Sequence, residues 1–313
     1  MLSQYLLDRA VVLGRSGGRS RKAIIWRAYA ALNKVIGAKQ MVRFDVLGHD
    51  MLLPAGSGLP SVKSRHPGYS HNLGRIARAV AGKYAGSWAI DIGANTGDTA
   101  VVIYQYSRMS ILCIEASEYY YSICKRNTEG LGETLVVKAV VDDKSGRRAG
   151  TFVEENGGGR IVDGSSGTIE SMGLPDILAS HSEVGSVRLI KVDTEGYDGR
   201  ILSGAASWLQ EHCPALFWEC QPVSDRDCGG PGYGLFDLLL SCGYGYFLFY
   251  ANTGEYLTSC DKSSLSVAED LFHFFANRNG HPPQYMDICA LAKADQDVFL
   301  AIRNGELSQY GKQ

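Results

Sequence analysis

The chain has 313 residues, 45% of them hydrophobic, which allows one large domain or two with a sizeable buried core. Its formal net charge of −2 argues against a general nucleic-acid binder, because such proteins usually carry a strong basic excess. The sequence shows no secretory signal pattern and no apolar run near the roughly 18 residues that a membrane span requires. The eight cysteines form no C-x-x-C pair, so no zinc site of the usual spacing is indicated. We expect a soluble, cytoplasmic, thiol-reduced protein.

Residues 1–40 are predicted to form a helical extension. Apolar residues over 1–36 have amphipathic spacing, with a break at "GRSGGRS" (14–20). The only acid in the segment is Asp8, whereas its basic side chains are Arg9, Arg15, Arg19, Arg21, Lys22, Arg27, Lys34 and Lys39. Such a segment could contact an anionic surface or a partner, or form a homodimer. The alternative is a solvated helical face.

A regular alternation of strands and helices follows. A small strand pair is expected at 41–53, a helix at 69–84, and then short apolar strands at 87–91, 111–116, 135–141, 187–193 and 215–220. Helices are expected at 98–108, 117–129, 199–211 and 233–243, and closing strands at 244–250 and 285–292. Strands that are apolar on both faces and alternate with helices indicate a parallel sheet covered on both sides. Glycine-rich loops at 156–160, 163–167 and 228–234 follow strands, where an open sheet places its ligand crevice.

The stretch "AIDIGANTGDT" (89–99) has the character of a cofactor loop between a strand and a helix. Gly93 and Gly97 would let the backbone approach a ligand, and the next helix would point free N–H groups at it. A dinucleotide fingerprint needs G-x-G-x-x-G, but Asn95 stands in place of the second glycine. Asp91 at the strand end suits the ammonium of an amino-acid-like ligand. The loop therefore favours S-adenosylmethionine, and a turn without a ligand is the alternative.

Three further carboxylates stand at strand ends. Glu115, at the end of the second strand, could accept hydrogen bonds from two ribose hydroxyls of either cofactor. Asp193 and Glu195 follow the fourth strand in "LIKVDTEGYDGRIL" (189–202) and could face one crevice, because residues two apart on an extended chain point the same way. Their mutual repulsion could raise one pKa and make that group a general base, or the pair could hold a divalent cation. The alternative is helix capping by Glu195 or Asp198.

Glu219 ends the otherwise apolar strand in "PALFWECQP" (214–222). A charge there is costly unless it is paired or lies near solvent at a site. Glu219 is therefore a third candidate for the crevice, and an edge residue that reaches water is the alternative.

Together these segments resemble the FkbM-type family of S-adenosylmethionine-dependent methyltransferases. The matching segments are "YSHNLGRIA" (69–77), "AIDIGANTGDTA" (89–100), "CIEAS" (113–117), "VVDDKSG" (140–146), "IKVDTEGYDGRILSG" (190–204), "PALFWEC" (214–220) and "MDICALAK" (286–293). The resemblance covers roughly residues 41–295, and the combination of the two longest motifs is more specific than either alone. Many family members carry a proline where Ala116 stands.

The resemblance implies an α/β fold of the class I methyltransferase (Rossmann-like) type. Its seven-stranded sheet would be mostly parallel, with an antiparallel last strand and helices on both faces. The cofactor S-adenosylmethionine would bind in the loops, with Glu115 on the ribose and Asp142 near the adenine. The other cofactor contacts expected are Asp91, Gly93, Asn95, Gly97, Asp98, Thr99, Ala116 and Asp193. The domain would span 41–300, followed by a tail at 301–313.

The same resemblance implies O-methylation of a sugar, glycoconjugate or secondary metabolite. An alcohol is a poor nucleophile at neutral pH, so a base or a metal should assist the methyl transfer. Glu195 or Asp193 is the predicted base, with Glu219 assisting. A nucleic-acid methyltransferase is less compatible, since no N-P-P-Y-type loop follows the fourth strand. A nicotinamide-dependent oxidoreductase and a non-catalytic binding protein are the remaining alternatives, because fold does not prove activity.

Overall fold

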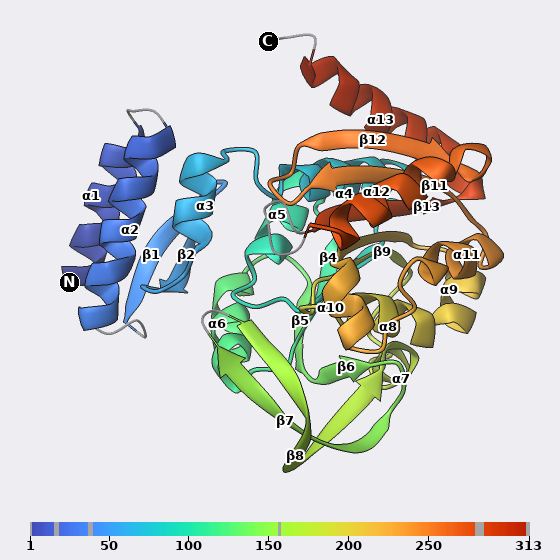
Figure 1. Cartoon of the computed structure of the whole chain (residues 1–313), viewed down its shortest axis with the longest axis horizontal. Helices are drawn as coiled ribbons and strands as arrows, with labels where there is room; N and C mark the ends of the chain where they lie inside the picture. The colour runs from blue at the N-terminus through green and yellow to red at the C-terminus, as the bar shows by residue number, and fades with distance from the viewer. Residues whose placement is uncertain (1, 16–18, 37–39, 156–157, 279–284, 311–313) are drawn as a thin grey trace.

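The computed structural model describes residues 2–15, 19–36, 40–155, 158–278 and 285–310. Its largest sheet has eight strands in the spatial order β5-β4-β3-β9-β10-β13-β11-β12 (Figure 1). Their bounds are β3 (Trp88–Ile92), β4 (Ser110–Glu115), β5 (Thr134–Lys138), β9 (Val187–Val192), β10 (Ala215–Cys220), β11 (Tyr244–Ala251), β12 (Tyr256–Asp261) and β13 (Met286–Ala292).

The strand directions match the expected fold. The five strands from β5 to β10 run parallel, and the last strand, β13, lies antiparallel between β10 and β11. Apart from this insertion, the order is that of a doubly wound sheet. Strands are first added on one side of β3, as β4 and β5, and then on its other side, as β9 and β10. The count differs by one, because β12 adds an antiparallel edge strand beside β11. The sheet therefore has eight strands rather than seven.

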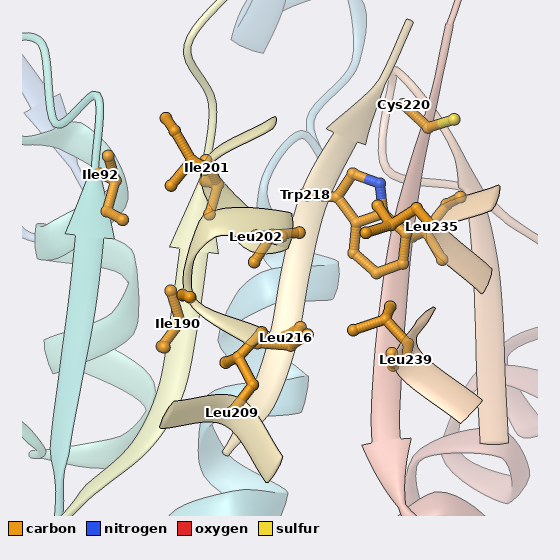
Figure 2. Packing of buried hydrophobic residues seen from close by; sticks show 14 of the residues in the cluster. Ile92, Ile190, Ile201, Leu202, Leu209, Leu216, Trp218, Cys220, Leu235 and Leu239 are labelled. Carbon is orange, nitrogen blue, oxygen red and sulfur yellow. The ribbon is translucent and has the colours of Figure 1, made fainter. Parts of the chain in front are cut away.

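Helices cover both faces of this sheet, because each strand alternates side chains between two apolar cores. In β9, Ile190 packs in a core with α8 (Asp198–Gly204), α9 (Ala206–His212), α11 (Gly234–Ser241) and α12 (Ser266–Ala276). Its neighbour Leu189 packs on the opposite face in a core with α4 (His71–Lys83), α5 (Asp98–Ser107), α6 (Glu118–Thr128) and α13 (Gln296–Tyr310). Figure 2 shows the first core, where Ile201, Leu202 and Leu209 lie over Ile190 and Leu216.

A second, three-stranded sheet stands at one side of the large one. It consists of β6 (Val140–Asp142), β8 (Gly158–Gly173) and β7 (Gly146–Glu155), in that order. The predicted strand 135–141 is therefore divided between the two sheets. The loop expected at 156–160 is wrong for residues 158–160, because they pair with β7 as part of β8. The loop expected at 163–167 is wrong only in part: Asp163 pairs with Gly150, but residues 164–167 fall where the register between β8 and β7 shifts. Residues 156–157 lie outside the described residues. The remaining short helices are α7 (Leu174–Ala179), α10 (Pro222–Asp227), η1 (Lys262–Ser264) and η2 (Lys293–Asp295).

The N-terminal part forms a third layer, as Figure 1 shows. Helices α1 (Leu2–Arg15) and α2 (Arg19–Ile36) match the predicted pair, and β1 (Met41–Val46) with β2 (His49–Pro54) forms the predicted strand pair. Helix α3 (Leu59–Arg65) follows. The inner faces of α1 and α2 contribute Leu7, Ala10, Trp26 and Tyr29 to a core shared with Val42, Val46, Val101 and Val102.

The predicted tail at 301–313 differs from the structure. Residues 301–310 are the second half of α13, so the boundary placed at residue 300 falls inside a helix. Glu306 of this helix is buried and receives hydrogen bonds from Arg75 Nε and Nη2 at 2.8 Å each. All eight cysteines carry free thiols. No helix within the described ranges combines the length and apolar character needed to cross a membrane.

Candidate active site

The loop between β3 and α5 has the backbone geometry that its glycines permit. Gly93 has φ +74°, Asn95 φ +48° and Gly97 φ +83°, all in the left-handed region that favours glycine. A Cβ atom at Gly93 would lie 1.9 Å from the carbonyl oxygen of Asp193. Gly93 is therefore required both for the turn and for the close approach of the loop after β9. Gly97 is the N-cap residue of α5.

Glu115 lies at the end of β4 and closes the same loop. Its Oε2 accepts a hydrogen bond from the Asn95 N–H at 2.7 Å, and its Oε1 accepts one from the Ser117 N–H at 2.8 Å. Burial raises the pKa of Glu115, and these two backbone donors oppose the rise. A carboxylate offers about four lone-pair positions, so two remain for hydroxyl donors.

A cavity of about 360 Å³ opens in front of this loop. Of the predicted cofactor contacts, those on its wall are Gly93, Asn95, Asp98, Thr99, Glu115, Ala116 and Asp193. One end is apolar, formed by Val140, Val141, Phe152 and Ile161 of the second sheet. At the other end Asp193 and Glu195 line the wall together with Tyr69 of the loop before α4. Because the sheet order is β5-β4-β3-β9, Glu115 at the end of β4 stands between Val140 and Val141, which follow β5, and Asp193 and Glu195, which follow β9.

Lys191 of β9 is a residue that the sequence analysis missed. It is buried, and in the parallel register it stands opposite Asp91 of β3. Its Nζ lies 2.9 Å from Asp91 Oδ1 and 3.5 Å from Asp193 Oδ2, and it donates to the Gly93 carbonyl oxygen at 3.0 Å. Burial alone would lower the pKa of Lys191, but the charges of Asp91 and Asp193 outweigh it and raise the pKa. A lysine inside the apolar run "VRLIKV" was the signal that could have revealed it.

Asp91 has a different position from the one expected. It is fully buried and does not line the cavity. Its carboxylate pairs with Lys191 and accepts a hydrogen bond from Thr99 Oγ1 at 2.5 Å. Asp91 thus orients Lys191 and the first turn of α5. It has no exposed surface in the cavity through which it could contact a ligand ammonium directly. Gly97 also lies behind the wall, where a Cβ would meet Cys124 Sγ at 3.2 Å.

Asp142 is likewise withdrawn from the cavity. It is buried, with Oδ1 at 2.6 Å from Arg200 Nε and Oδ2 at 3.2 Å from Arg148 Nε. Its carboxylate therefore belongs to an ion-pair network between β6, β7 and α8. The preceding residues Val140 and Val141, not Asp142, reach the cavity wall.

Asp193 and Glu195 both lie on the cavity wall, after the end of β9. Asp193 keeps 46% of its side chain exposed. Glu195 has φ +54°, a left-handed backbone conformation that non-glycine residues rarely adopt. Such strained residues are concentrated at functional sites. Burial and the neighbouring charge of Asp193 raise the pKa of Glu195. A carboxylate with a raised pKa is a stronger base at neutral pH.

Glu219 does not share this wall. It lines a smaller hollow with Asp198 and Gln221, whose side-chain amide donates to Glu219 Oε2. In the antiparallel register of β10 and β13 it stands opposite Asp287. Burial raises the pKa of Glu219 well above its ordinary value, and the charges of Asp193, Asp198 and Asp287 add to the effect. Glu219 therefore lies near Asp193 but outside the cavity.

Asp198 is the first residue of α8 and not its N-cap residue, which is Tyr197. Its Oδ2 accepts hydrogen bonds from Thr194 N at 3.1 Å and Thr194 Oγ1 at 2.9 Å, so it fixes the turn that carries Glu195. Burial and the charge of Asp193 raise the pKa of Asp198 to about 7. Within the described part of the chain, no group of three or more histidine, cysteine or acidic residues has a geometry that could hold a metal ion. The expected divalent cation has no support there.

Comparison with known proteins agrees with the fold and the loop motifs. Residues 91–246 match the family described as "Methyltransferase FkbM domain". This domain belongs to the FkbM family of methyltransferases. Its sheet is the expected class I methyltransferase sheet, with one strand added at the edge. A search of the curated proteins finds no match.

The solved structures similar to this chain are distant. The FkbM methyltransferase from Methylobacillus flagellatus is 17% identical, with a TM-score of 0.38, and the match covers 55% of this chain but only 42% of that protein. An O-methyltransferase from Bacillus cereus, in complex with SAH, is 14% identical over 71% of this chain and 80% of that one, with a TM-score of 0.38. The METTL16 MTase domain is 11% identical over 93% and 91%, with a TM-score of 0.47.

Proposed function

We propose that this protein transfers the methyl group of S-adenosylmethionine to a hydroxyl of a sugar, glycoconjugate or secondary metabolite. The observation that carries the proposal is the lining of the cavity, in which Glu115 at the end of β4 stands between apolar residues that follow β5 and carboxylates that follow β9. An adenosine needs apolar surface for its base and acceptors for its ribose hydroxyls. A hydroxyl that receives a methyl group needs a nearby base.

The cofactor would be held by groups from three elements. Val140, Val141 and Phe152 would surround the adenine, and the free lone pairs of Glu115 would accept from the ribose hydroxyls. The loop of Gly93 to Thr96 would face the methionine part. When bound, S-adenosylmethionine supplies a methyl group on a sulfonium, and the protein's own task is alignment.

Glu195 is the proposed general base. It lies on the wall at the acceptor end, and its raised pKa favours proton uptake from a hydroxyl near neutral pH. Asp193 is proposed to bind hydroxyls of the acceptor. Its Oδ2 lies 3.5 Å from Lys191 Nζ, and this ion pair would keep the carboxylate in position. Glu219 lies outside the cavity, and it is proposed to hold the Gln221 side chain in place rather than to contact the acceptor.

Calorimetric titration with S-adenosylmethionine tests the cofactor assignment. We expect binding by the wild-type protein and a loss of about 10-fold to 100-fold in Glu115→Gln, because hydrogen bonds to a charged group contribute about 1.5–3 kcal/mol. Glu118→Gln is the matched control, since Glu118 is an exposed acid on the next helix. Absence of binding by the wild-type protein would overturn the assignment and favour a non-catalytic or nicotinamide-binding protein.

A transfer assay with labelled cofactor and a panel of hydroxylated acceptors tests the reaction. We expect Glu195→Gln to bind the cofactor normally but to lower kcat by about 10²–10⁴-fold, the usual contribution of a general base. Product analysis should locate the label on an oxygen atom. A label on nitrogen or carbon, with intact cofactor binding, would refute the O-methylation and leave the cofactor assignment standing.

A further inference from the structure

The N-terminal helix pair, α1 and α2, presents one face to the protein and a second face to solvent. The inner face buries Leu7, Ala10, Trp26 and Tyr29 in a core shared with β1, β2 and α5. Since both helices contact the same core, their opposite sides point away from the molecule together. Figure 1 shows the pair at the edge of the molecule, with β1, β2 and α3 between it and the large sheet.

The outer face of the pair is rich in large apolar side chains. Those on α1 are Leu2, Tyr5, Val12 and Leu13, which are 56%, 59%, 57% and 40% exposed, and those on α2 are Ile24 and Leu32, at 67% and 46%. At about 100° per residue, each set falls within roughly 100° of arc, which places it on one side of its helix. Six of the thirteen large apolar side chains that the described residues expose lie on these two helices. Such concentrations mark protein or membrane contact sites.

Positive charge is interleaved with these apolar side chains. Arg9, Arg21 and Arg27 are exposed, and Arg9 follows Tyr5 by four residues while Arg27 follows Ile24 by three. Asp8 is the only acid in the sequence of residues 1–36, and it receives a hydrogen bond from Gln4 Nε2 at 2.9 Å. The outer face therefore offers arginines to an anionic partner and has almost no negative charge to neutralise them.

We propose that this outer face docks on an anionic lipid membrane, with α1 and α2 lying in the plane of its surface. The apolar side chains would enter the boundary between headgroups and acyl chains, and the arginines would contact lipid phosphates. Neither helix is long and apolar enough to cross a membrane, so the association is peripheral. The inference does not depend on the proposed methyl transfer.

Two other occupants fit the face less well. A second copy of the chain in a two-fold dimer would bring Arg9, Arg21 and Arg27 near their own counterparts, and Asp8 is the only acid of the helix pair that could balance them. A nucleic-acid backbone would satisfy the arginines but would leave Leu2, Tyr5 and Ile24 without an apolar partner. An anionic bilayer supplies both kinds of contact at once.

Flotation of the full-length protein with lipid vesicles tests the proposal. We expect binding to vesicles of phosphatidylcholine mixed with phosphatidylglycerol, weak binding to phosphatidylcholine alone, and loss of binding at high salt. The double variant Arg9→Gln/Arg27→Gln should bind about 30-fold more weakly, because each basic residue near the surface contributes about 1 kcal/mol and 1.4 kcal/mol is tenfold. Ile24→Ser should also weaken binding, by removing an apolar contact.

Matched controls come from another part of the surface. Arg226→Gln on α10 and Leu257→Ser on β12 remove an arginine and a leucine that are 73% and 43% exposed, and both should bind vesicles like the wild type. Equal binding by the wild type and the arginine double variant would overturn the proposal, as would failure to bind anionic vesicles. A light-scattering series that shows a dimer abolished by Ile24→Ser would assign the face to a second copy and would also overturn it.

Discussion

Lys191 ties together three parts of the site that are far apart in sequence. Its Nζ contacts Asp91 on β3, the Gly93 carbonyl in the loop between β3 and α5, and Asp193 after β9. A buried charge of this kind is tolerated because its counter-ion, Asp91, is buried with it. Sequence could indicate a lysine in an apolar strand, but only the register of β3 and β9 places Asp91 opposite it. The sequence alone therefore suggests a ligand as the partner of Asp91, because it does not reveal that Lys191 lies opposite.

Lys191→Met should therefore destabilise the protein more than a surface change would. It leaves Asp91 buried without its cation, and breaking such a pair typically costs about 3–5 kcal/mol. The double variant Asp91→Asn/Lys191→Met should recover part of that loss, because the unpaired charge is removed. Urea denaturation of Lys191→Met, Asp91→Asn and the double variant measures the coupling energy between Lys191 and Asp91. Simple addition of the two single effects would show that the pair does not interact energetically.

Asp198 should make the stability of the folded protein depend on pH. Its pKa is raised from an ordinary 3.8 to about 7 in the folded state, chiefly by burial and by Asp193. Between these values the native state binds more protons than the unfolded state, so the free energy of unfolding falls as pH rises, by at most about 1.4 kcal/mol per pH unit. The fall stops above about pH 7, where both states are ionised.

Asp198→Asn removes this titration and keeps an acceptor for Thr194. We expect its stability relative to the wild type to increase steadily from about pH 5 to pH 7 and then to stay constant. Asp237→Asn, at an exposed position on α11, is the control. A difference between Asp198→Asn and the wild type that is the same at every pH would show that Asp198 does not titrate in this range.

At the scale of elements, the sequence predicted the apolar strands well and the more polar strands poorly. β9 and β10 were placed within one residue, because a strand buried on both faces leaves a continuous apolar signature. β12 was missed because its sequence "YLTSCD" lies at the sheet edge and is only partly buried. Two glycine-rich segments of β8 were expected to be loops because glycine has low β-propensity, yet pairing with β7 overrides it at residues 158–160. That pairing also brings Phe152 and Ile161 to the cavity wall.

Helix α13 should contribute directly to stability through Glu306. Both of its carboxylate oxygens accept from Arg75 of α4 at 2.8 Å, and it is buried. Glu306→Ala should lower the free energy of unfolding by about 1.5–3 kcal/mol, the range for hydrogen bonds to charged groups. Glu269→Ala on α12, where the side chain is 54% exposed, should have little effect. If the two variants unfold at the same urea concentration, α13 behaves as the tail that the sequence suggested.

At the scale of the whole molecule, α5 lies between two apolar cores. Ala100 and Ile103 pack toward the large sheet, whereas Val101 and Val102 pack toward the N-terminal layer. The loop that follows β3 leads into the first turn of this helix through Gly97. A boundary at residue 40 therefore separates two stretches of sequence but not two cores. Helical periodicity predicted the N-terminal helices, but it carries no information about which surface they cover.

Removal of residues 1–36 should therefore lower the stability of the remaining chain, because these residues share a core with it. It strips Trp26, Tyr29 and Leu7 from the core and exposes Val42 and Val101. Each large apolar side chain contributes about 1.5–3 kcal/mol on burial, and a typical domain is stable by only about 5–15 kcal/mol. We expect the truncated chain to lose its cooperative calorimetric transition or to melt well below the full-length protein. Leu13→Ser and Ile24→Ser on the outer face should melt with the wild type, because exposed positions usually change stability by less than about 0.5 kcal/mol. A truncated chain that melts like the full-length protein would mean that α5 has a complete core without the helix pair.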